Sequence, residues 1–321
     1  MWIITGATGF IGSALAWELN EHGGNDLVVS DFVTPAERPG LLRKRKFKEF
    51  VPADDLFGYL EKAPTVHGVF HMGACSTTTE TDEEYLRRNN IEYSQKIFDF
   101  CTRRQVPLIY ASSGATYGDG KKGFDDATDP SEFKPLNLYG WSKLKFDIWA
   151  LQQKKTPPRW YGLRFFNVYG PNEYHKGDMA SVAFKAFNQI RERGSLRLFK
   201  SHNPAYKDGE QLRDFVYVKD ITRWMREIME RPATASGIYN MGYGEARSWL
   251  DLARATFASM ERPVAIDWIE VPANIRDQYQ YFTEAKMDRL MAQKLSPPQW
   301  PLEKGVTDYV RNYLSEKDPN L

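Results

Sequence analysis

Residues 2–13 read Trp2-Ile3-Ile4-Thr5-Gly6-Ala7-Thr8-Gly9-Phe10-Ile11-Gly12-Ser13, and this stretch decides the fold of the chain. It begins as a short apolar strand, passes through a glycine turn and continues with the apolar spacing of a helix through Leu15 and Leu19. Such a turn lets the backbone approach a pyrophosphate, and the free N–H groups at the helix start face its negative charge. The spacing Gly-x-x-Gly-x-x-Gly differs by one residue from the Gly-x-Gly-x-x-Gly of many dehydrogenases. The stretch predicts a dinucleotide-binding site.

Strand patterns and helical patterns alternate after the glycine turn. The second strand, Leu27 to Asp31, ends in an acid that stands where a carboxylate can hold the adenosine ribose. Further strands are expected at 68–71, 107–112 and 161–165, and helices at 83–104 and around Tyr139. This alternation predicts an α/β fold of the Rossmann type, a doubly wound parallel sheet wrapped by helices.

The pattern becomes less regular after Pro171, where polar loops at 175–178 and 202–212 are expected to cover a substrate. A strand-then-helix pattern at 213–220 indicates that the chain returns to the first domain there. We therefore expect an NAD(P)-binding Rossmann domain, residues 1–170 and 214–234, and a smaller mixed α/β C-terminal substrate-binding domain, residues 171–213 and 235–321.

Composition favours a soluble cytoplasmic enzyme. The chain has 321 residues, 42% of them hydrophobic, which is enough for a large core. Its net charge of +1 argues against bulk nucleic-acid binding. The sequence has no apolar run long enough to indicate a membrane span. We also expect no signal peptide, because the first strand begins at residue 2. Cys75 and Cys101 lack metal-ligand spacing, so we expect reduced thiols and no metal site.

Tyr139 and Lys143 are the candidate catalytic pair. At positions i and i+4 of a helix, the two side chains project from one face toward the same volume. A neighbouring cation favours the phenolate, and each unit by which the pKa of tyrosine falls below ~10 corresponds to ~1.4 kcal/mol. The spacing alone is common, since a packed tyrosine and a solvated lysine meet this way by chance. Together with the dinucleotide turn, it predicts that Tyr139 acts as a base.

Several motifs carry a resemblance to a known family. The stretches are Gly6–Gly12, Ser113, Tyr139-x-x-x-Lys143, Arg164-Phe165-Phe166-Asn167-Val168-Tyr169-Gly170-Pro171 and Arg213-Asp214-Phe215-Val216. Together they resemble the extended short-chain dehydrogenase/reductase superfamily, whose members remodel nucleotide-activated sugars. More narrowly, His71–Thr78, Asn89-Asn90, Pro135–Gly140 and His175–Ser181 look like the ADP-L-glycero-D-manno-heptose 6-epimerases. This resemblance implies an ADP-linked heptose as substrate, a role in supplying heptose for the lipopolysaccharide core, and a homo-oligomer, typically a pentamer.

The resemblance also implies a mechanism. The hydrogen on C6 of the heptose is not acidic enough for direct abstraction, so C6 is oxidised with NADP as the hydride acceptor, and the transient 6-ketone is reduced on its opposite face. The two epimers present the hydroxyl in different places, so two acid/base residues are implied, Tyr139 and Lys176. Lys143 would hold the ribose hydroxyls and lower the pKa of Tyr139, and Ser113 would hydrogen-bond the reacting oxygen.

The expected site residues fall into two further sets. For the cofactor they are Gly6, Gly9, Phe10, Ile11, Gly12, Asp31, Arg38, Met72, Gly73, Ala74, Cys75, Ser76, Asn89, Tyr139, Lys143, Val168 and Lys176. For the substrate they are Ser113, Asn167, Asp178, Lys185, Phe199, Lys200, Ser201, His202, Arg213 and Tyr279, with Arg213 paired to the diphosphate. Asp178 and Lys185 differ from the serine and histidine that are typical of the family.

Two alternatives stay open, a nucleotide-hexose C4 epimerase of the same fold and a non-catalytic dinucleotide sensor. The first shares Ser113, Tyr139 and Lys143 but has no need of Lys176, and the second would need no complete catalytic set. A nucleotide-sugar 4,6-dehydratase is disfavoured, because Ser113 is followed by Gly-Ala-Thr and not by the acids that dehydration requires. For the cofactor we expect NADP, since Arg38 can accept a 2′-phosphate, with NAD as the alternative because Asp31 suits an unmodified ribose.

Overall fold

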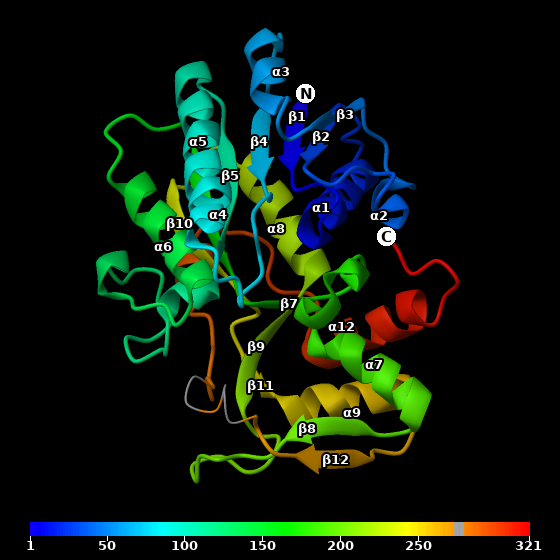
Figure 1. Ribbon diagram of the computed structural model, residues 1–321. Coiled ribbons are helices and arrows are strands. Elements are labelled where there is room, and N and C mark those ends of the chain that lie inside the picture. Colours follow the sequence, from blue (N-terminus) through cyan, green and yellow to red (C-terminus); the bar gives the residue numbers. More distant parts are fainter. Residues whose placement is uncertain (273–275, 277–278) are drawn as a thin grey trace.

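The computed structural model describes residues 1–272, 276 and 279–321, and Figure 1 shows their arrangement. Strands and helices alternate along most of the chain, with short 3₁₀ or π segments labelled η. In chain order the elements are β1 (Trp2–Thr5), α1 (Phe10–Glu21), β2 (Leu27–Asp31), α2 (Pro39–Leu42), β3 (Glu49–Pro52), α3 (Leu56–Lys62), β4 (Gly68–His71), α4 (Glu83–Leu86), η1 (Arg87–Glu92), α5 (Tyr93–Arg104), β5 (Leu108–Ser113), η2 (Gly114–Tyr117), η3 (Pro130–Glu132), α6 (Leu138–Leu151), β6 (Trp160–Phe165), β7 (Asn167–Tyr169), η4 (Tyr174–Met179), α7 (Val182–Arg193), β8 (Leu196–Phe199), β9 (Leu212–Tyr217), α8 (Val218–Glu230), β10 (Gly237–Met241), β11 (Ala246–Ser248), α9 (Trp249–Ser259), β12 (Ile266–Ile269), α11 (Asp288–Met291), α12 (Leu302–Tyr309) and η5 (Val310–Leu314).

A seven-stranded sheet forms the larger part of the molecule, with strand order β10-β6-β5-β4-β1-β2-β3. Each neighbouring pair in it is parallel. The strand order changes direction between β1 and β4, and this is the point at which ligands bind in open α/β sheets. The predicted Rossmann-type sheet is confirmed.

Alternate residues of each strand point to opposite faces of this sheet, and each face carries its own helices. On β1, Ile4 packs with Leu15 of α1 and Trp224 of α8 in one buried cluster. Its neighbour Ile3 packs with Phe98 of α5 in a second cluster on the other face, which α3 and α6 also join. The sheet is therefore covered on both sides, as a fully buried parallel sheet requires.

A smaller lobe is built from α7, α9 and α12 around the parallel pair β8–β12 (Figure 1). The three-stranded sheet β11-β9-β7 links this lobe to the large sheet. The expected strand and helix at 213–220 are confirmed as β9 and the start of α8. Helix α8 returns to pack with α1, whereas β9 pairs with β7 and β11 outside the large sheet.

Strand β10 bears on the expected domain boundary. It pairs with β6 at the edge of the large sheet, although the division by sequence placed residues 235–321 with the substrate domain. A division that follows the sheets would keep β10 with residues 1–170.

Within the described part of the chain, no helix has both the length and the apolar character needed to cross a membrane.

Candidate active site

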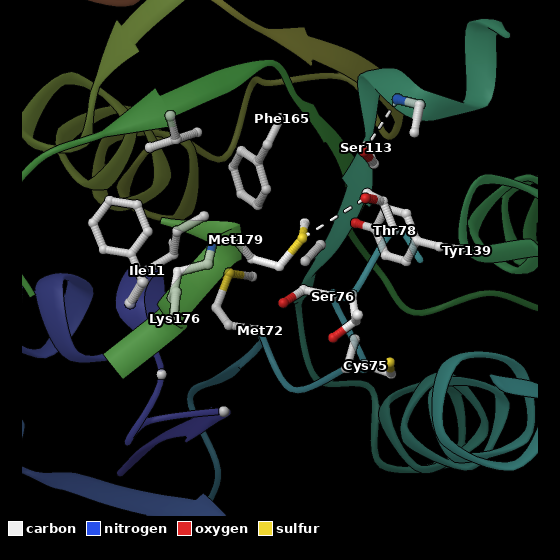
Figure 2. Close-up of a pocket in the computed structure, with 18 of the residues that line it drawn as sticks. Ile11, Met72, Cys75, Ser76, Thr78, Ser113, Tyr139, Phe165, Lys176 and Met179 are labelled. Atoms are coloured by element: carbon white, nitrogen blue, oxygen red, sulfur yellow. Dashed lines mark hydrogen bonds between the residues drawn. The ribbon is translucent and has the colours of Figure 1, made fainter. Parts of the chain in front are cut away.

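A large cavity opens at the carboxyl ends of the parallel strands, with a volume of about 890 Å³. Its walls come from the ends of β1, β2, β4, β5 and β6, from the segment 175–182, and from Phe215 and Trp249 of the smaller lobe. The cavity thus lies at the switch point of the sheet and between the two lobes, where ligand sites of this fold gather. Figure 2 shows part of its lining.

The glycine turn forms one end of the cavity, and its glycines contribute only backbone atoms to the lining. Gly6 has φ +66°, and a Cβ there would lie 2.5 Å from the backbone nitrogen of Gly73. A Cβ on Gly12 would lie 2.1 Å from the carbonyl oxygen of Gly6. Gly9 precedes α1 and provides no side-chain cap, so the first N–H groups of this 12-residue helix are available to a ligand. This cradle fits the pyrophosphate of a dinucleotide.

Asp31 and Arg38 lie together beside the turn. The Asp31 carboxylate accepts hydrogen bonds from the backbone N–H and hydroxyl of Thr8, at 3.0 and 2.8 Å, and from the N–H of Phe32 at 2.8 Å. Arg38 donates to the carbonyl of Thr8 at 3.0 Å. Both side chains line the cavity, so a carboxylate and a guanidinium are available at the same end of the site.

Tyr139 and Lys143 project from one face of α6 into the cavity, and Asn137 caps this helix by accepting from the N–H of Gly140 at 2.7 Å. The Lys143 ammonium donates to the carbonyl of Ala111 at 3.0 Å, and burial lowers the pKa of Lys143 to about 8. Burial raises the pKa of Tyr139, against the effect of a hydrogen bond with Ser113.

In this structure burial raises the pKa of Tyr139, and the expected lowering by Lys143 stays a prediction. The phenol is almost fully enclosed, so the loss of hydration of the phenolate raises the pKa.

Lys176 approaches the cavity from a different segment, η4, which follows β7. In Figure 2 its side chain lies across the cavity from Tyr139, with Met72 and Met179 between them. Its ammonium lies 5.5 Å from the centre of the Phe10 ring, and burial lowers the pKa of Lys176. A lysine that is half removed from water in this way can exchange a proton more readily near neutral pH.

The structure brings the whole expected cofactor set together. The cavity lining contains Gly6, Gly9, Phe10, Ile11, Gly12, Asp31, Arg38, Met72, Gly73, Ala74, Cys75, Ser76, Asn89, Tyr139, Lys143, Val168 and Lys176. These residues come from stretches that are far apart in the sequence, yet they lie around one space. Their contact with a cofactor stays a prediction.

The expected substrate residues divide into three groups. Ser113 and Asn167 line the cavity. Phe199, Arg213 and Tyr279 form a cluster next to it, in which the Arg213 guanidinium lies 5.5 Å from the Tyr279 ring and 5.6 Å from the ring of Trp249. The third group lies outside the cavity lining and consists of Asp178, Lys185, Lys200, Ser201 and His202.

The hydrogen bonds of this third group are with other parts of the protein. Lys185 donates to the backbone carbonyl of Asp178 at 2.6 Å. Lys200 and His202 both lie within ion-pair distance of Glu270, at 3.0 and 3.2 Å. The structure thus does not bring these residues to the walls of the cavity, and their contact with substrate stays a prediction.

Sequence reasoning missed several residues of the site. Buried Asn90 holds the loop after β4, because its amide exchanges hydrogen bonds with the backbone of Cys75 at 2.8 and 3.0 Å and donates to Ser142 of α6 at 2.9 Å. It lies in η1, a π turn inside the helix expected at 83–104, and π turns are often found at functional sites. Thr78, Met179 and Trp249 also line the cavity. Thr78 and Met179 lie within stretches that carry the family resemblance but were not named as site residues, and Trp249 is brought there by tertiary packing.

His71 is a buried structural residue. One ring nitrogen is 2.7 Å from the hydroxyl of Thr5 and the other is 2.9 Å from that of Ser94. Burial, with a smaller effect of Lys143, lowers the pKa of His71 to about 3, so the ring is neutral at physiological pH.

Within the described residues, no group of three or more His, Cys, Asp or Glu side chains could hold a metal ion.

Comparison with known proteins gives consistent relatives. The chain matches the model of the NAD dependent epimerase/dehydratase family over residues 2–242. It is 45% identical, over an alignment of 333 residues that covers 100% of both chains, to an ADP-L-glycero-D-manno-heptose-6-epimerase of Fusobacterium nucleatum. The protein of that name from Nitratidesulfovibrio vulgaris is 46% identical over 325 residues, again with 100% of both chains covered. The crystal structure of the Helicobacter pylori protein of that name is similar with a TM-score of 0.78 and 28% identity, covering 97% of this chain and 95% of that one.

The glycine turn yields a first prediction. Gly6→Ala should weaken dinucleotide binding and lower the melting temperature, because the new Cβ meets backbone atoms of Met72 and Gly73 that cannot move independently. Gly23→Ala is the matched control, since Gly23 also has positive φ but a Cβ there meets nothing within 4 Å. Positive φ alone costs about 1–3 kcal/mol. Calorimetric binding and thermal unfolding compare the two variants, and equal losses in both would contradict the close-approach interpretation.

Proposed function

This chain belongs to the NAD dependent epimerase/dehydratase family and, within it, to the ADP-L-glycero-D-manno-heptose-6-epimerases, and on this premise we propose that it inverts C6 of ADP-D-glycero-D-manno-heptose. The observation that carries the proposal is the presence of two candidate acid/base residues, Tyr139 and Lys176, on opposite sides of one cavity. The product, the L-glycero epimer, would supply heptose for the lipopolysaccharide core.

The chemistry of the substrate requires oxidation. C6 is a secondary alcohol carbon whose hydrogen has no neighbouring carbonyl to make it acidic, so a base alone cannot remove it. A nicotinamide dinucleotide, when bound, supplies a reversible hydride acceptor for C6, and the sugar passes through a 6-ketone. Reduction of the ketone on its opposite face gives the other epimer with no net oxidation. The protein must therefore move a proton to and from the C6 oxygen in two orientations.

Tyr139 would serve one of these orientations. Its phenol is held beside Ser113, which can hydrogen-bond the C6 oxygen as charge develops there. The Lys143 ammonium, fixed to the carbonyl of Ala111, would hold the ribose hydroxyls of the cofactor and place a positive charge beside the phenol. Because burial raises the pKa of Tyr139, the phenol favours its protonated form and suits the role of acid in the reductive direction.

Lys176 would serve the other orientation. The buried carboxylate of Glu173 closes the segment that bears Lys176, accepting from the N–H of Gly170 at 3.2 Å and from the hydroxyl of Ser181 at 2.7 Å. The segment is thus tied at both ends, and the lysine side chain is directed from it into the cavity. A generic C4 epimerase has no use for a base on this side, and this supports C6 as the site of inversion.

Arg213 would bind the diphosphate of the substrate. Arg213 is 8% exposed, and its guanidinium lies against the rings of Trp249 and Tyr279. Its hydrogen bonds go to the backbone carbonyls of Leu212 and Gln280, and Gln280 lines the cavity. A buried guanidinium whose described partners are carbonyls retains its full charge for an anion, and its planar fork matches phosphate oxygens.

We infer NADP as the preferred cofactor, with NAD as the alternative. Arg38 lines the cavity beside Asp31, where the 2′-position of an adenosine ribose would lie. A guanidinium there can neutralise a 2′-phosphate. Asp31 supports NAD, since a carboxylate repels that phosphate and hydrogen-bonds a free hydroxyl instead.

The direct test of the proposed function is conversion of ADP-D-glycero-D-manno-heptose, followed by chromatographic separation of the two epimers. We expect both epimers at equilibrium from either starting material, with NADP or, in a parallel reaction, NAD supplied to cofactor-free protein. Turnover of a uridine-linked hexose in place of the heptose would establish the C4-epimerase alternative. Bound cofactor without turnover of either sugar would favour the sensor.

Tyr139→Phe should lower kcat by about 100- to 10,000-fold, the range for loss of a general acid/base. The ring remains in place and only the oxygen that carries the proton is lost, so cofactor binding should persist. The rate of epimer formation and the retained cofactor measure the two effects separately. The control is Tyr59→Phe. It removes a hydroxyl that donates to Glu49 and lies outside the cavity lining. Turnover near that of the unmodified protein in Tyr139→Phe would refute the assignment.

Lys176→Met keeps an unbranched apolar stem and removes the proton-carrying amine. We expect epimerisation to fall by a similar factor, about 100- to 10,000-fold, while a 6-aldehyde analogue of the sugar is still oxidised or reduced in the orientation that Tyr139 serves. Tyr139→Phe should show the complementary defect. Lys155→Met, at an exposed lysine outside the cavity, controls for loss of positive charge. Unchanged epimerisation by Lys176→Met would return Lys176 to the role of a loop residue and favour inversion at C4.

A further inference from the structure

Helix α6 carries a third polar residue in register with Tyr139 and Lys143. Asp147 follows Lys143 by four residues, just as Lys143 follows Tyr139, so the three side chains form one stripe along the helix. All three are buried, and Asp147 is completely inaccessible to solvent. A buried carboxylate one turn behind two candidate catalytic groups needs a physical explanation, because its desolvation is costly.

Three successive residues of β5 contact this stripe, one for each side chain. The carbonyl of Ala111 accepts from the ammonium of Lys143 at 3.0 Å. The hydroxyl of Ser112 donates to Asp147 at 2.9 Å. The side chain of Ser113 lies close enough to the phenol of Tyr139 to lower its pKa, against the effect of burial. The end of β5 is therefore joined to the stripe of α6 at more than one residue, and sliding the helix along the strand would disturb these contacts.

Asp147 is the most strongly held of the three. Besides Ser112, it accepts from the phenol of Tyr110 at 3.1 Å and from Nε of Arg164 at 3.0 Å. Arg164 comes from β6, is also completely buried, and lies over the ring of Tyr117 at 4.9 Å. Asp147 thus ties α6 to two adjacent strands of the sheet, β5 and β6.

We propose that Asp147 is a positioning residue for the reaction: it fixes the register of α6 on β5, and its carboxylate balances the buried ammonium of Lys143. The proposal rests on the function assigned above to Tyr139 and Lys143. Asp147 itself lies outside the cavity lining and does not touch the reacting atoms.

The electrostatic part follows from the surroundings of Lys143. Burial lowers the pKa of Lys143 to about 8, and the negative charge of Asp147 opposes this effect. From β4 the lysine faces His71, which is neutral, and from the following loop it faces the thiol of Cys75. On its own helix it faces Tyr139, and the guanidinium of Arg164 behind Asp147 is paired. Among these groups, Asp147 is the carboxylate that keeps the lysine charged.

The test is Asp147→Asn, which preserves the shape but has no charge. Its amide oxygen can still accept from Ser112 and Arg164, and its NH₂ group would then face the oxygen of Tyr110, which can accept. Lys143 must be protonated to act, so activity is lost as pH rises through its pKa near 8. Loss of the carboxylate lowers that pKa further, and we expect the high-pH midpoint of kcat to move down by about 1 unit or more. Asp147→Glu should keep the midpoint while lowering kcat, because it keeps the charge and disturbs the register.

Two further measurements separate this role from a purely structural one. Tyr110→Phe removes one donor to the same carboxylate and leaves its charge, so the melting temperature should fall with no movement of the pH midpoint. If Asp147→Asn does not fold, Asp147→Asn/Arg164→Leu removes both buried charges and should fold, since apolar replacement of a buried pair is often tolerated. Loss of the Arg164 cation favours the charged form of Lys143 and partly offsets loss of the carboxylate, so a smaller downward shift is expected in that double variant. A pH midpoint that stays in place in a folded variant without the carboxylate would overturn the proposal.

Dinucleotide binding provides a readout that does not depend on the sugar. Lys143 would contact the ribose, so the affinity of cofactor-free protein for NADP and NAD should also decline at high pH, with the decline at lower pH in Asp147→Asn. If the unmodified protein fails to turn over the ADP-heptose, the proposed function is wrong, yet this binding measurement still decides the role of Asp147. Identical binding profiles for the unmodified protein and Asp147→Asn would refute that role.

Discussion

The contact between two backbone turns, at Gly6 and at Gly73, is the constraint on which the site depends. The turns follow β1 and β4, the strands between which the sheet reverses its order, and they approach so closely that no Cβ can stand between them. The N–H of Gly73 donates to the hydroxyl of Thr5 at 3.1 Å, which fixes the second turn against the end of β1. From there the loop continues to Cys75, whose backbone is held by Asn90, and Asn90 in turn bonds α6. One chain of contacts thus connects the dinucleotide cradle to the catalytic helix.

The two candidate bases are supported in different ways. Tyr139 lies on a helix whose neighbouring turns are hydrogen-bonded to a central strand, so its position is set by the large sheet. Lys176 lies on a short irregular segment, and a single buried carboxylate, Glu173, holds the two ends of that segment together. The first arrangement resists any movement of the base. The second places Lys176 next to Gly177, where an added Cβ would meet no atom within 4 Å, so the chain there is not closely packed. A reaction in which the sugar must present both faces is compatible with one fixed and one less constrained partner.

Local patterns predicted what depends on local structure. The strand, turn and helix at 2–13 could be read from the sequence because glycine spacing and apolar spacing both act within a few residues, and the i, i+4 relation of Tyr139 and Lys143 is a property of any helix. The direction of the Tyr139 pKa shift could not be read, because burial is created by distant segments that close over the phenol. For the same reason Asn90 and Met179 were quoted only within motifs and given no place in the site, and Trp249 was not considered. Strand β10 was missed as a member of the large sheet because its partner, β6, is far away in sequence.

The late position of β10 has a consequence for how the protein is made. The large sheet is completed by residues 237–241, and α1 receives its packing partner α8 only from residues 218–230. During synthesis at about 5–20 residues per second, the first strands and their exposed apolar faces must therefore wait on the order of ten seconds or more for the segments that cover them. After β6 and before α8 and β10, the ribosome also makes α7 and β8, which belong to the smaller lobe. The two lobes are interleaved along the chain, so the apolar faces of the first strands stay uncovered until more than two thirds of the chain has been made, which prolongs their exposure to aggregation.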